Sequence, residues 1–291
     1  MDQPKITQAM INAYDEYTHL TLDRRDFMHK LQLLAGSAAA AAAIAPLIAA
    51  SSAKADIIPP DDNRLEAQDI TYSGAPAEIK AYMAAPKDGP EKLPAVIVIH
   101  ENRGLNNHIR DVTRRVALEG FLAMAPDLLS PSGGTPDDED KARDLISKSS
   151  ADINRTNLIS GVEYLRNFKR STGNVGAIGF CWGGGWANQL AIAAPDLKAA
   201  VAYYGMQPAA DQVPKIKAAL MLHYAGLDER IDAGIDAYKK ALEADHKDFQ
   251  IFVYDGVNHA FNNDTAAARY DKKAADLAWG RTIKFLKEKL A

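Results

Sequence analysis

The chain has 291 residues, of which 47% are hydrophobic and 25% are charged, with 19 glycines and 14 prolines. This ordinary globular composition excludes a disordered chain, a collagen-like repeat and a membrane protein with many spans. The 34 basic and 38 acidic side chains give a formal charge of −4. Because no excess of positive charge is available to neutralise phosphates, nucleic acid is not an expected partner.

The N-terminal region has the three-part layout of an export signal. A charged segment that contains Arg24-Arg25 precedes an apolar, alanine-rich run, and Ala53-Lys54-Ala55 then matches a small-x-small cleavage site. The arginine pair, with Phe27 two positions later, resembles the twin-arginine signal, whose export machinery transports folded cargo. We therefore predict that residues 1–55 form a preamble and a twin-arginine export signal, and that the protein is exported, into the periplasm where the cell has an outer membrane.

Two other interpretations of this region stay open. The run 31–52 is long enough to span a bilayer, for which roughly 20 residues are needed, so the region can be a single retained anchor. It can also be an amphipathic leader with no targeting role. The sequence offers no account of the long preamble before Thr21.

Residues 56–291 are predicted to form one domain in which strands and helices alternate. The segments 67–73 and 78–84 flank a Gly-Ala-Pro turn, which predicts a hairpin at a sheet edge. The continuous apolar run 94–100 is typical of a strand that is buried on both faces. Short apolar runs predict further strands at 121–125, 175–180, 199–204, 218–224 and 250–254. Helical spacing, an acidic start or position between strands predicts helices at 108–119, from 136–140 onward, and at 153–168, 184–194, 233–244 and 265–289.

This alternation predicts the α/β class, with an open and mostly parallel sheet covered by helices on both faces. In such sheets, ligands bind beyond the carboxyl ends of the strands. The residues that directly follow predicted strands are therefore the candidates for a functional site.

The only cysteine, Cys181, follows the predicted strand 175–180 in the pattern Gly179-x-Cys-x-Gly183. A glycine two positions before and after a nucleophile is typical of the sharp strand-to-helix turn called a nucleophile elbow, in which larger side chains would clash. The following helix N-terminus favours a thiolate over a thiol. A single cysteine excludes an intramolecular disulfide. The alternative interpretation of Cys181 is a buried cysteine that packs in a glycine-rich turn. Because the motif lies between a predicted strand and a predicted helix, we predict that Cys181 is a nucleophile.

An acid and a histidine follow two later strands. Asp228 comes after the run 218–224, and His259 comes after the run 250–254. The chain order of nucleophile, acid and histidine is the one that α/β-hydrolases use. We expect His259 to accept the thiol proton and Asp228 to fix its tautomer. Glu229 and Asp232 are weaker candidates for the acid because they lie farther from the strand.

The segment His100-Glu101-Asn102-Arg103-Gly104 follows the strongest predicted strand. In this fold the corresponding loop donates a backbone N–H to the oxyanion hole, together with the residue after the nucleophile. Asn102 and Trp182 are thus the expected backbone donors. A carboxylate beside a thiolate is unfavourable, so Glu101 is expected to exchange a proton or to move when a ligand binds.

These motifs resemble the dienelactone hydrolase family, also called carboxymethylenebutenolidases. The resemblance extends over about residues 69–286 and is most specific in H-E-N-R-G-L at 100–105, G-F-C-W-G-G at 179–184, and the downstream G-L-D and N-H-A-F. It implies an α/β-hydrolase fold in which Cys181, His259 and Asp228 open lactones or enol esters through an acyl-thioester. It also implies that Glu101 keeps the resting cysteine neutral and accepts its proton once substrate displaces the glutamate.

The chain departs from the family pattern at a residue that binds the carboxylate of the substrate. Members of the family bind this group with arginines, one of them four residues beyond the catalytic histidine, where this chain has Asn263. Arg103 is the remaining candidate for this contact. The expected partner is a small lactone or ester, dienelactone-like or otherwise, bound by a monomer without metal or organic cofactor.

Three alternatives come from other interpretations of the same residues. A metal hydrolase would have to use His100, Glu101, His223 and His259, but no metal-ligand spacing joins these residues. An exported, non-catalytic binding protein that keeps the fold is the stronger rival. Finally, the aromatic residues Trp182, Trp186, Tyr203 and Tyr204 can line a substrate pocket, although core packing is the favoured interpretation.

Overall fold

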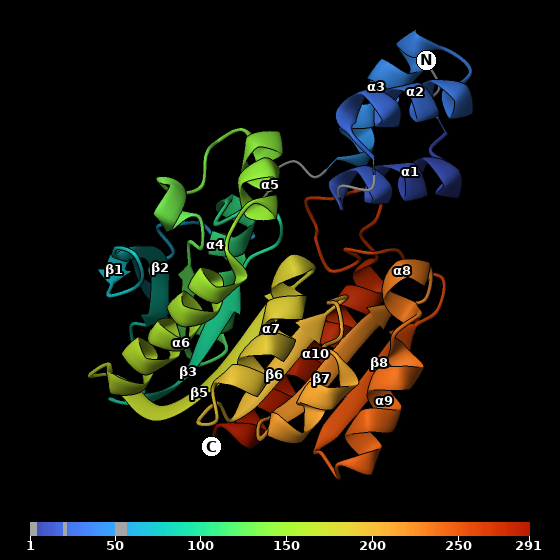
Figure 1. Cartoon of the computed structure of the whole chain (residues 1–291). Helices are drawn as coiled ribbons and strands as arrows, with labels where there is room; N and C mark the ends of the chain where they lie inside the picture. Colours follow the sequence, from blue (N-terminus) through green and yellow to red (C-terminus); the bar gives the residue numbers. More distant parts are fainter. Residues whose placement is uncertain (1–4, 20–21, 50–56) are drawn as a thin grey trace.

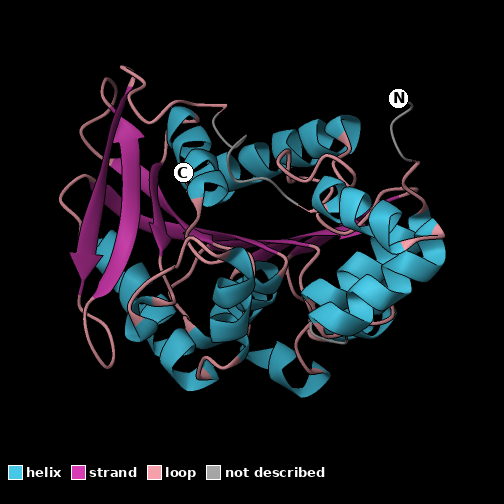
Figure 2. Cartoon of the chain, turned by 90° about the horizontal axis from the view of Figure 1, so that it is seen from above, coloured by secondary structure: helices cyan, strands magenta, loops and turns pink. Residues whose placement is uncertain are grey.

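The computed structural model describes residues 5–19, 22–49 and 57–291. Its main body is an eight-stranded sheet with helices on both faces (Figures 1 and 2). The strands are β1 (Leu65–Tyr72), β2 (Ile79–Pro86), β3 (Leu93–Ile99), β4 (Leu122–Pro126), β5 (Ser171–Phe180), β6 (Ala199–Tyr203), β7 (Ala219–Ala225) and β8 (Phe249–Tyr254).

The sheet has the strand order β1-β2-β4-β3-β5-β6-β7-β8. The pairs β1–β2 and β2–β4 are antiparallel, and every later pair is parallel. This arrangement confirms the predicted α/β class with its mostly parallel sheet, and the predicted hairpin lies at the β1 edge. The carboxyl ends of β3, β5, β7 and β8 consequently meet on one side, where the predicted site residues follow them.

The helices of this body are α4 (Asn107–Leu118), α5 (Glu139–Ser147), α6 (Ala151–Asn167), α7 (Trp182–Ala193), α8 (Glu229–Asp232), α9 (Ile235–Ala244) and α10 (Lys272–Lys289), with 3₁₀ helices η2 (Ser130–Ser132) and η3 (Ala210–Lys215). On each face of the sheet, a hydrophobic core lies between the strands and these helices. Helices α4 and α10 pack on one face of the sheet, against residues such as Val96 and Val98 of β3. Helices α6, α7 and α9 pack on the other face, against Ile97 and Ile99. Because side chains of β3 alternate between two cores, its sequence is apolar throughout.

The last helix begins later than the sequence predicts. The expected helix 265–289 starts at Lys272, where Asp271 caps it by accepting a hydrogen bond from the backbone N–H of Ala274 at 2.8 Å. The seven preceding residues form turns instead. The side chain of Asn263 accepts hydrogen bonds from the backbone N–H and hydroxyl of Thr265, at 3.0 and 2.6 Å. These local bonds compete with helix formation and hold the loop that follows His259.

Three N-terminal helices form a separate group: α1 (Gln8–Thr18), α2 (Arg24–Ala35) and α3 (Ala38–Ile48) (Figure 1). They enclose a small core of their own, in which Tyr17 stacks on Phe27 with ring centroids 4.8 Å apart. The apolar run of the predicted signal is divided at Gly36, which has φ +81°. Within the described chain no single helix is long and apolar enough to cross a membrane, and α2 with α3, bent by 110°, meets the length and composition test only as a pair. The predicted cleavage site at 53–55 lies outside the described residues, and the boundary at residue 55 stays a prediction.

The buried side chain of Asn157 on α6 generates a stability prediction. Its amide accepts a hydrogen bond from the backbone N–H of Ala75 at 2.7 Å and donates one to the carbonyl of Ala75 at 2.9 Å. Asn157→Ala would leave both backbone groups without this partner, so we expect the free energy of unfolding to fall by about 2–4 kcal/mol in chemical denaturation. The matched control is Asn167→Ala on the exposed end of the same helix, with an expected change below about 0.5 kcal/mol. Equal losses in the two variants would contradict the predicted role of Asn157.

Candidate active site

Cys181 lies in the turn between β5 and α7, with φ 56° and ψ −117°, a conformation that residues with a side chain rarely adopt. The neighbouring glycines make the turn possible. A Cβ on Gly179 would lie 1.9 Å from the carbonyl oxygen of Gly183, and a Cβ on Gly183 would lie 2.3 Å from the carbonyl oxygen of Ile99. The glycines of the motif are therefore required by the close packing of backbone against backbone, as the sequence indicates.

The thiol of Cys181 is buried, with 8% of the residue exposed. Burial raises the pKa of this thiol, but the positive charges of His259 and His19 outweigh burial and hold the pKa at about 6. Cys181 is also the N-cap residue of α7, where the helix dipole favours a negative charge. At neutral pH the sulfur is therefore mainly a thiolate, the nucleophilic form of cysteine.

His259 and Asp228 form a buried pair beside the thiol. Nδ1 of His259 lies 2.5 Å from Oδ2 of Asp228. No hydrogen bond reaches Nε2 of His259 from the described residues, and a ring nitrogen of His259 lies within 4.8 Å of the Cys181 sulfur. Burial lowers the pKa of His259, but Asp228 and the thiolate outweigh it and raise the pKa well above its ordinary value. The structure thus brings together the three residues that the sequence nominated from separate strands.

The loop after β3 is anchored by His100, which is fully buried. Its Nε2 accepts a hydrogen bond from the backbone N–H of Leu128 at 3.2 Å, and its Nδ1 donates to the carbonyl of Glu101 at 2.7 Å. Burial lowers the pKa of His100, in keeping with a neutral ring that accepts at one nitrogen and donates at the other. The ring also stacks on Trp182 with centroids 5.4 Å apart. His100 therefore orders the loop.

The carboxylate of Glu101 is held by the residue at which this chain departs from the family pattern. Oε2 of Glu101 accepts a hydrogen bond from the side chain of Asn263 at 2.8 Å, while Oε1 is buried with no partner among the described residues. Glu101 and Cys181 line the same cavity of about 30 Å³. Asn263 therefore binds a carboxylate of the protein itself in this structure.

The two expected oxyanion donors lie beside a larger cavity of about 380 Å³ that also reaches Cys181. Trp182 is the first residue of α7, so its backbone N–H has no acceptor within the helix. Asn102 lies in the turn after β3, and its side chain donates to the carbonyl of Thr18 at 2.7 Å. This placement is compatible with both residues presenting an N–H to the reacting carbonyl.

Arg103 does not line the larger cavity. Its guanidinium is paired with Glu139 and donates a hydrogen bond to the hydroxyl of Tyr14 at 3.0 Å. Positive charge beside the larger cavity comes instead from Arg143 and Arg230, which the sequence did not single out. Arg143 lies far from every strand-end motif, and Arg230 lies two residues after Asp228, but only the folded arrangement shows that both line the cavity.

The aromatic residues divide between the two interpretations that the sequence left open. Trp182, Trp186 and Tyr204 line the larger cavity. Tyr203 is fully buried in the core, and its hydroxyl lies 2.7 Å from that of Thr282. The cavity is therefore largely aromatic on one side.

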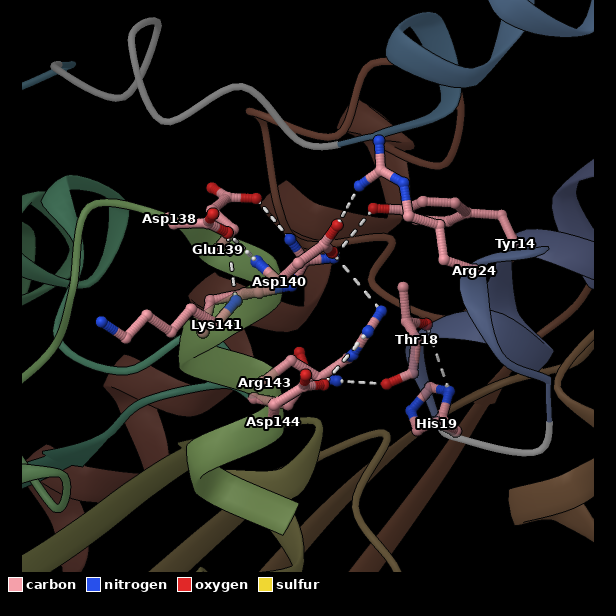
Figure 3. A network of polar contacts seen from close by, with 12 residues as sticks. Tyr14, Thr18, His19, Arg24, Asp138, Glu139, Asp140, Lys141, Arg143 and Asp144 are labelled. Carbon is pink, nitrogen blue, oxygen red and sulfur yellow. Dashed lines mark hydrogen bonds and ion pairs between the residues drawn. The ribbon is translucent and has the colours of Figure 1, made fainter. Parts of the chain in front are cut away.

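The N-terminal preamble supplies a group that the sequence reasoning missed. Nε2 of His19 lies 3.4 Å from the sulfur of Cys181, and the ring of His19 packs edge-on against that of His259 with centroids 4.7 Å apart. Figure 3 shows His19 and its neighbours on α1 beside the polar side chains of α5. No sequence signal joins positions 162 residues apart, and only tertiary packing brings them together.

Of the described residues, one group of His, Cys and acidic side chains is compact enough to share a metal ion: His19, Cys181 and His259, with candidate ligand atoms within 4.8 Å of one another. The four residues of the metal-hydrolase alternative do not form such a group. The ring of His223 lies 2.9 Å from the hydroxyl of Tyr254 and 3.1 Å from that of Thr282. Burial lowers its pKa to about 3, so His223 is a neutral core residue.

Comparisons with known proteins agree with this geometry. The model of the "Dienelactone hydrolase family" matches residues 79–290. A protein of Escherichia coli O157:H7 named "Putative carboxymethylenebutenolidase" is 32% identical over 256 residues, which cover 82% of this chain and 93% of that protein. A protein of Saccharolobus solfataricus with the same name is 33% identical over 258 residues, covering 76% of this chain and 98% of that protein.

Solved structures with similar folds include two whose titles name dienelactone hydrolases or proteins like them. The crystal structure titled a "Putative Dienelactone Hydrolase" from Klebsiella pneumoniae superposes with a TM-score of 0.69 at 28% identity, covering 77% of this chain and 99% of that one. A dienelactone hydrolase-like promiscuous phosphotriesterase from metagenomic libraries has a TM-score of 0.71 at 22% identity, covering 79% of this chain and 100% of that one. This second likeness concerns the fold alone.

The tight turn at Cys181 generates a second prediction. In Gly179→Ala the new methyl group would lie 1.9 Å from a backbone oxygen that cannot move without shifting α7. We expect the free energy of unfolding to fall by about 3 kcal/mol or more, measured in chemical denaturation. Gly185→Ala on the same helix is the control, because its methyl group would meet Met206 at an ordinary 3.6 Å. That variant is expected to remain within about 1 kcal/mol of the parent, and a similar tolerance of Gly179→Ala would refute the steric argument.

Proposed function

The chain belongs to the dienelactone hydrolase family and is a hydrolase that acts on carboxylic esters, and from this we propose that it opens lactones or cleaves enol and carboxylic esters with Cys181 as its nucleophile. The observation that carries the proposal is the buried thiol at the strained turn, with the His259–Asp228 pair beside it. Family membership favours this enzyme over a non-catalytic binding protein that keeps the same fold.

The first half of the proposed reaction acylates the enzyme. In the resting enzyme the proton is on Nε2 of His259, and the Cys181 thiolate attacks the ester carbonyl carbon to form a tetrahedral intermediate. The carbonyl π electrons move onto oxygen, where the backbone N–H groups of Asn102 and Trp182 are the proposed donors. The C–O bond to the leaving group then breaks, and the leaving oxygen takes the proton from His259. For a lactone, that oxygen stays attached to the acyl group.

The second half releases the product. His259, now neutral at Nε2, accepts a proton from water as the water oxygen attacks the thioester carbonyl. The tetrahedral intermediate collapses by breaking the C–S bond, which yields the carboxylic acid and restores the Cys181 thiolate beside protonated His259. Asp228 holds the ring orientation and stabilises the imidazolium in both halves. The sum is ester plus water giving acid plus alcohol, and it needs no oxidant or cofactor.

Glu101 is proposed to act as the activation switch that the family resemblance implies. Its carboxylate is buried, shares the 30 Å³ cavity with Cys181 and has one oxygen without a partner, so it is the group that an entering substrate oxygen would displace. Asn263 holds the other oxygen at 2.8 Å, which gives the carboxylate a defined resting position. The shared cavity therefore supports the proposal that Glu101 moves when the carbonyl of the substrate approaches Cys181.

The larger cavity supports a substrate with an apolar or aromatic acyl group. Its volume of about 380 Å³ is in the range of small-molecule pockets, and Trp182, Trp186 and Met206 line it. Arg143 and Arg230 supply positive charge on its wall, so a substrate that bears a carboxylate can be held there without Arg103. Dienelactone-like compounds fall within this class.

Export by the twin-arginine machinery, a periplasmic location and a monomeric state are further proposals. The first two rest on the order of arginine pair, apolar run and Ala53-Lys54-Ala55. Arg25 is exposed at the start of α2, whereas Arg24 is paired with Asp140. Recognition of the pair by the export machinery therefore requires the Arg24–Asp140 contact to open.

The nucleophile assignment predicts the effect of removing the sulfur. Full-length protein is assayed on a dienelactone, an enol lactone and a p-nitrophenyl ester, alongside Cys181→Ala and Cys181→Ser. We expect the Ala variant to lose at least roughly 10³-fold in kcat/KM on every substrate that the parent hydrolyses, because no acyl-enzyme can form. Mass spectrometry of the parent after brief mixing checks for acyl addition at Cys181. Retained turnover in the Ala variant would overturn the assignment.

Asp228→Asn tests the orienting carboxylate without removing the helix cap. Oδ1 of Asp228 accepts from the backbone N–H of Ile231 at 3.3 Å, a bond that an amide oxygen can keep. The variant is expected to fold normally and to lose on the order of 10³–10⁴-fold in kcat, because the neutral amide no longer stabilises the His259 imidazolium. Asp236→Asn, an exposed acid on α9, is the matched control with unchanged kcat. Equal activity in both variants would remove Asp228 from the site.

A further inference from the structure

Residues 5–19, for which the sequence offered no account, lie directly over the site. The side chain of Asn102 donates to the carbonyl of Thr18, and the amide of Gln8 lies 2.5 Å from the side-chain oxygen of Asn258. The guanidinium groups of Arg143 and Arg269 lie over the rings of Tyr17 and Tyr14, 4.1 and 5.0 Å from their centroids. These contacts reach the loops that follow β3 and β8 as well as α5, and Figure 3 shows the side chains of α1 beside those of α5. The segment is therefore held at three places beside the site.

Within this segment, Asp15 and His19 form a second pair of an acid and a histidine beside the sulfur, in which the ring is hydrogen-bonded to the backbone carbonyl of Asp15. Nδ1 of His19 lies 2.8 Å from the carbonyl oxygen of Asp15 and 3.3 Å from its carboxylate, and Nε2 lies 3.4 Å from the Cys181 sulfur. The proton on Nδ1 is thereby fixed toward Asp15, and Nε2 faces the sulfur. The imidazole rings of His259 and His19 therefore both lie beside one sulfur. The carboxylate of Asp228 binds the first ring, and the carboxylate of Asp15 lies 3.3 Å from the second.

The charges around these groups favour an ion pair. Burial lowers the pKa of His19, but the Cys181 thiolate and Asp15 outweigh it and raise the pKa to about 9. Burial raises the pKa of Asp15, but His259 and His19 outweigh burial, and the net pKa is below its usual range. Among the described residues, the other charged or titratable groups near the two pairs include Glu101, Tyr204, Arg230, Asp232 and Arg269.

The docked segment leaves room for a substrate. Thr18 and His19 form part of the wall of the 380 Å³ cavity, opposite residues such as Trp186 and Met206 on the main body. The sulfur is accessible from this cavity even though helix α1 covers the site. The segment is therefore a wall of the pocket and does not fill it.

We propose that His19, held by Asp15, is a second imidazole partner of the Cys181 sulfur, so that the preamble supplies a catalytic residue. The inference rests on the proposed function of Cys181 as the nucleophile. His19 takes its proton from solvent, donates Nε2–H to the thiolate before attack, and keeps that proton throughout. When the thioester C–S bond breaks, the electron pair returns to sulfur and the same N–H stabilises the departing thiolate. His259 alone exchanges protons with the leaving group and with water.

The experiment measures alkylation of Cys181 by iodoacetamide between pH 5 and 9 in full-length protein with a chelator present, so that no metal ion masks the thiol. We expect the parent to react with an apparent pKa near 6. In His19→Ala this pKa should rise by about one unit, with an alkylation rate at pH 6 about fivefold lower and restored by added imidazole. The kcat for ester hydrolysis should fall by about tenfold.

Two further variants separate chemistry from structure. His19→Gln fills the same space without a positive charge and is expected to behave as His19→Ala, so a parent-like pH profile in this variant would reduce His19 to packing and overturn the proposal. His29→Ala, an exposed histidine on α2, is the matched control with an unchanged profile. Thermal unfolding of each variant checks that the helices remain folded.

The role proposed for His19 can be tested independently of the proposed ester hydrolysis, because alkylation needs no ester substrate. An unchanged alkylation profile in His19→Ala overturns the role of His19 whether or not the enzyme hydrolyses esters. If the profile shifts in His19→Ala while the parent hydrolyses none of the esters, the result supports the His19–sulfur contact and overturns the proposed ester chemistry.

Discussion

The site depends on one strained residue. Cys181 is held at φ 56° between β5 and α7, and this turn exists because Gly179 and Gly183 allow backbone to approach backbone. The cost of such a conformation is of the order of 1–3 kcal/mol, and the surrounding strand and helix must supply it. In this turn Cys181 occupies the N-cap of α7 at the carboxyl edge of the sheet. The loops after β3, β7 and β8 end at the same edge and complete the site.

Burial and nearby positive charges have opposite effects on the pKa of Cys181, and the effect of the charges is the larger one. A thiol removed from water would ordinarily resist ionisation, but two imidazole rings face it and lower its pKa to about 6. The carboxylates of Asp228 and Asp15 in turn keep those rings protonated. The carboxylate of Glu101 lines the same small cavity as Cys181, and the side chain of Asn263 donates a hydrogen bond to its Oε2. This hydrogen bond and the two protonated imidazole rings offset the negative charges of the carboxylate and the thiolate in one buried site.

The N-terminal helices give the region before residue 55 a structural role beside the site. A segment whose composition indicates an export signal also closes one wall of the pocket and contacts the nucleophile. A chain cut after Ala55 would lack Thr18, His19 and the contacts of α1, and its thiol would meet a different electrostatic environment. The proposed export signal and the proposed second imidazole partner of the sulfur therefore lie in the same N-terminal region of the full-length chain.

Local sequence chemistry determined the α/β class and the order of strands and helices, and the structure confirms this class because strand periodicity acts over a few residues. Local chemistry also singled out Cys181, Asp228, His259 and Glu101 as candidates, and parallel strands bring these residues to one edge of the sheet. Their roles in catalysis stay predictions. The start of α10 could not be predicted, because side-chain bonds of Asn263 compete with the helix. Only tertiary structure decided that Arg103 turns to Tyr14 and that Asp15 and His19 reach the sulfur. Those contacts join segments far apart in the chain, and no local periodicity encodes them.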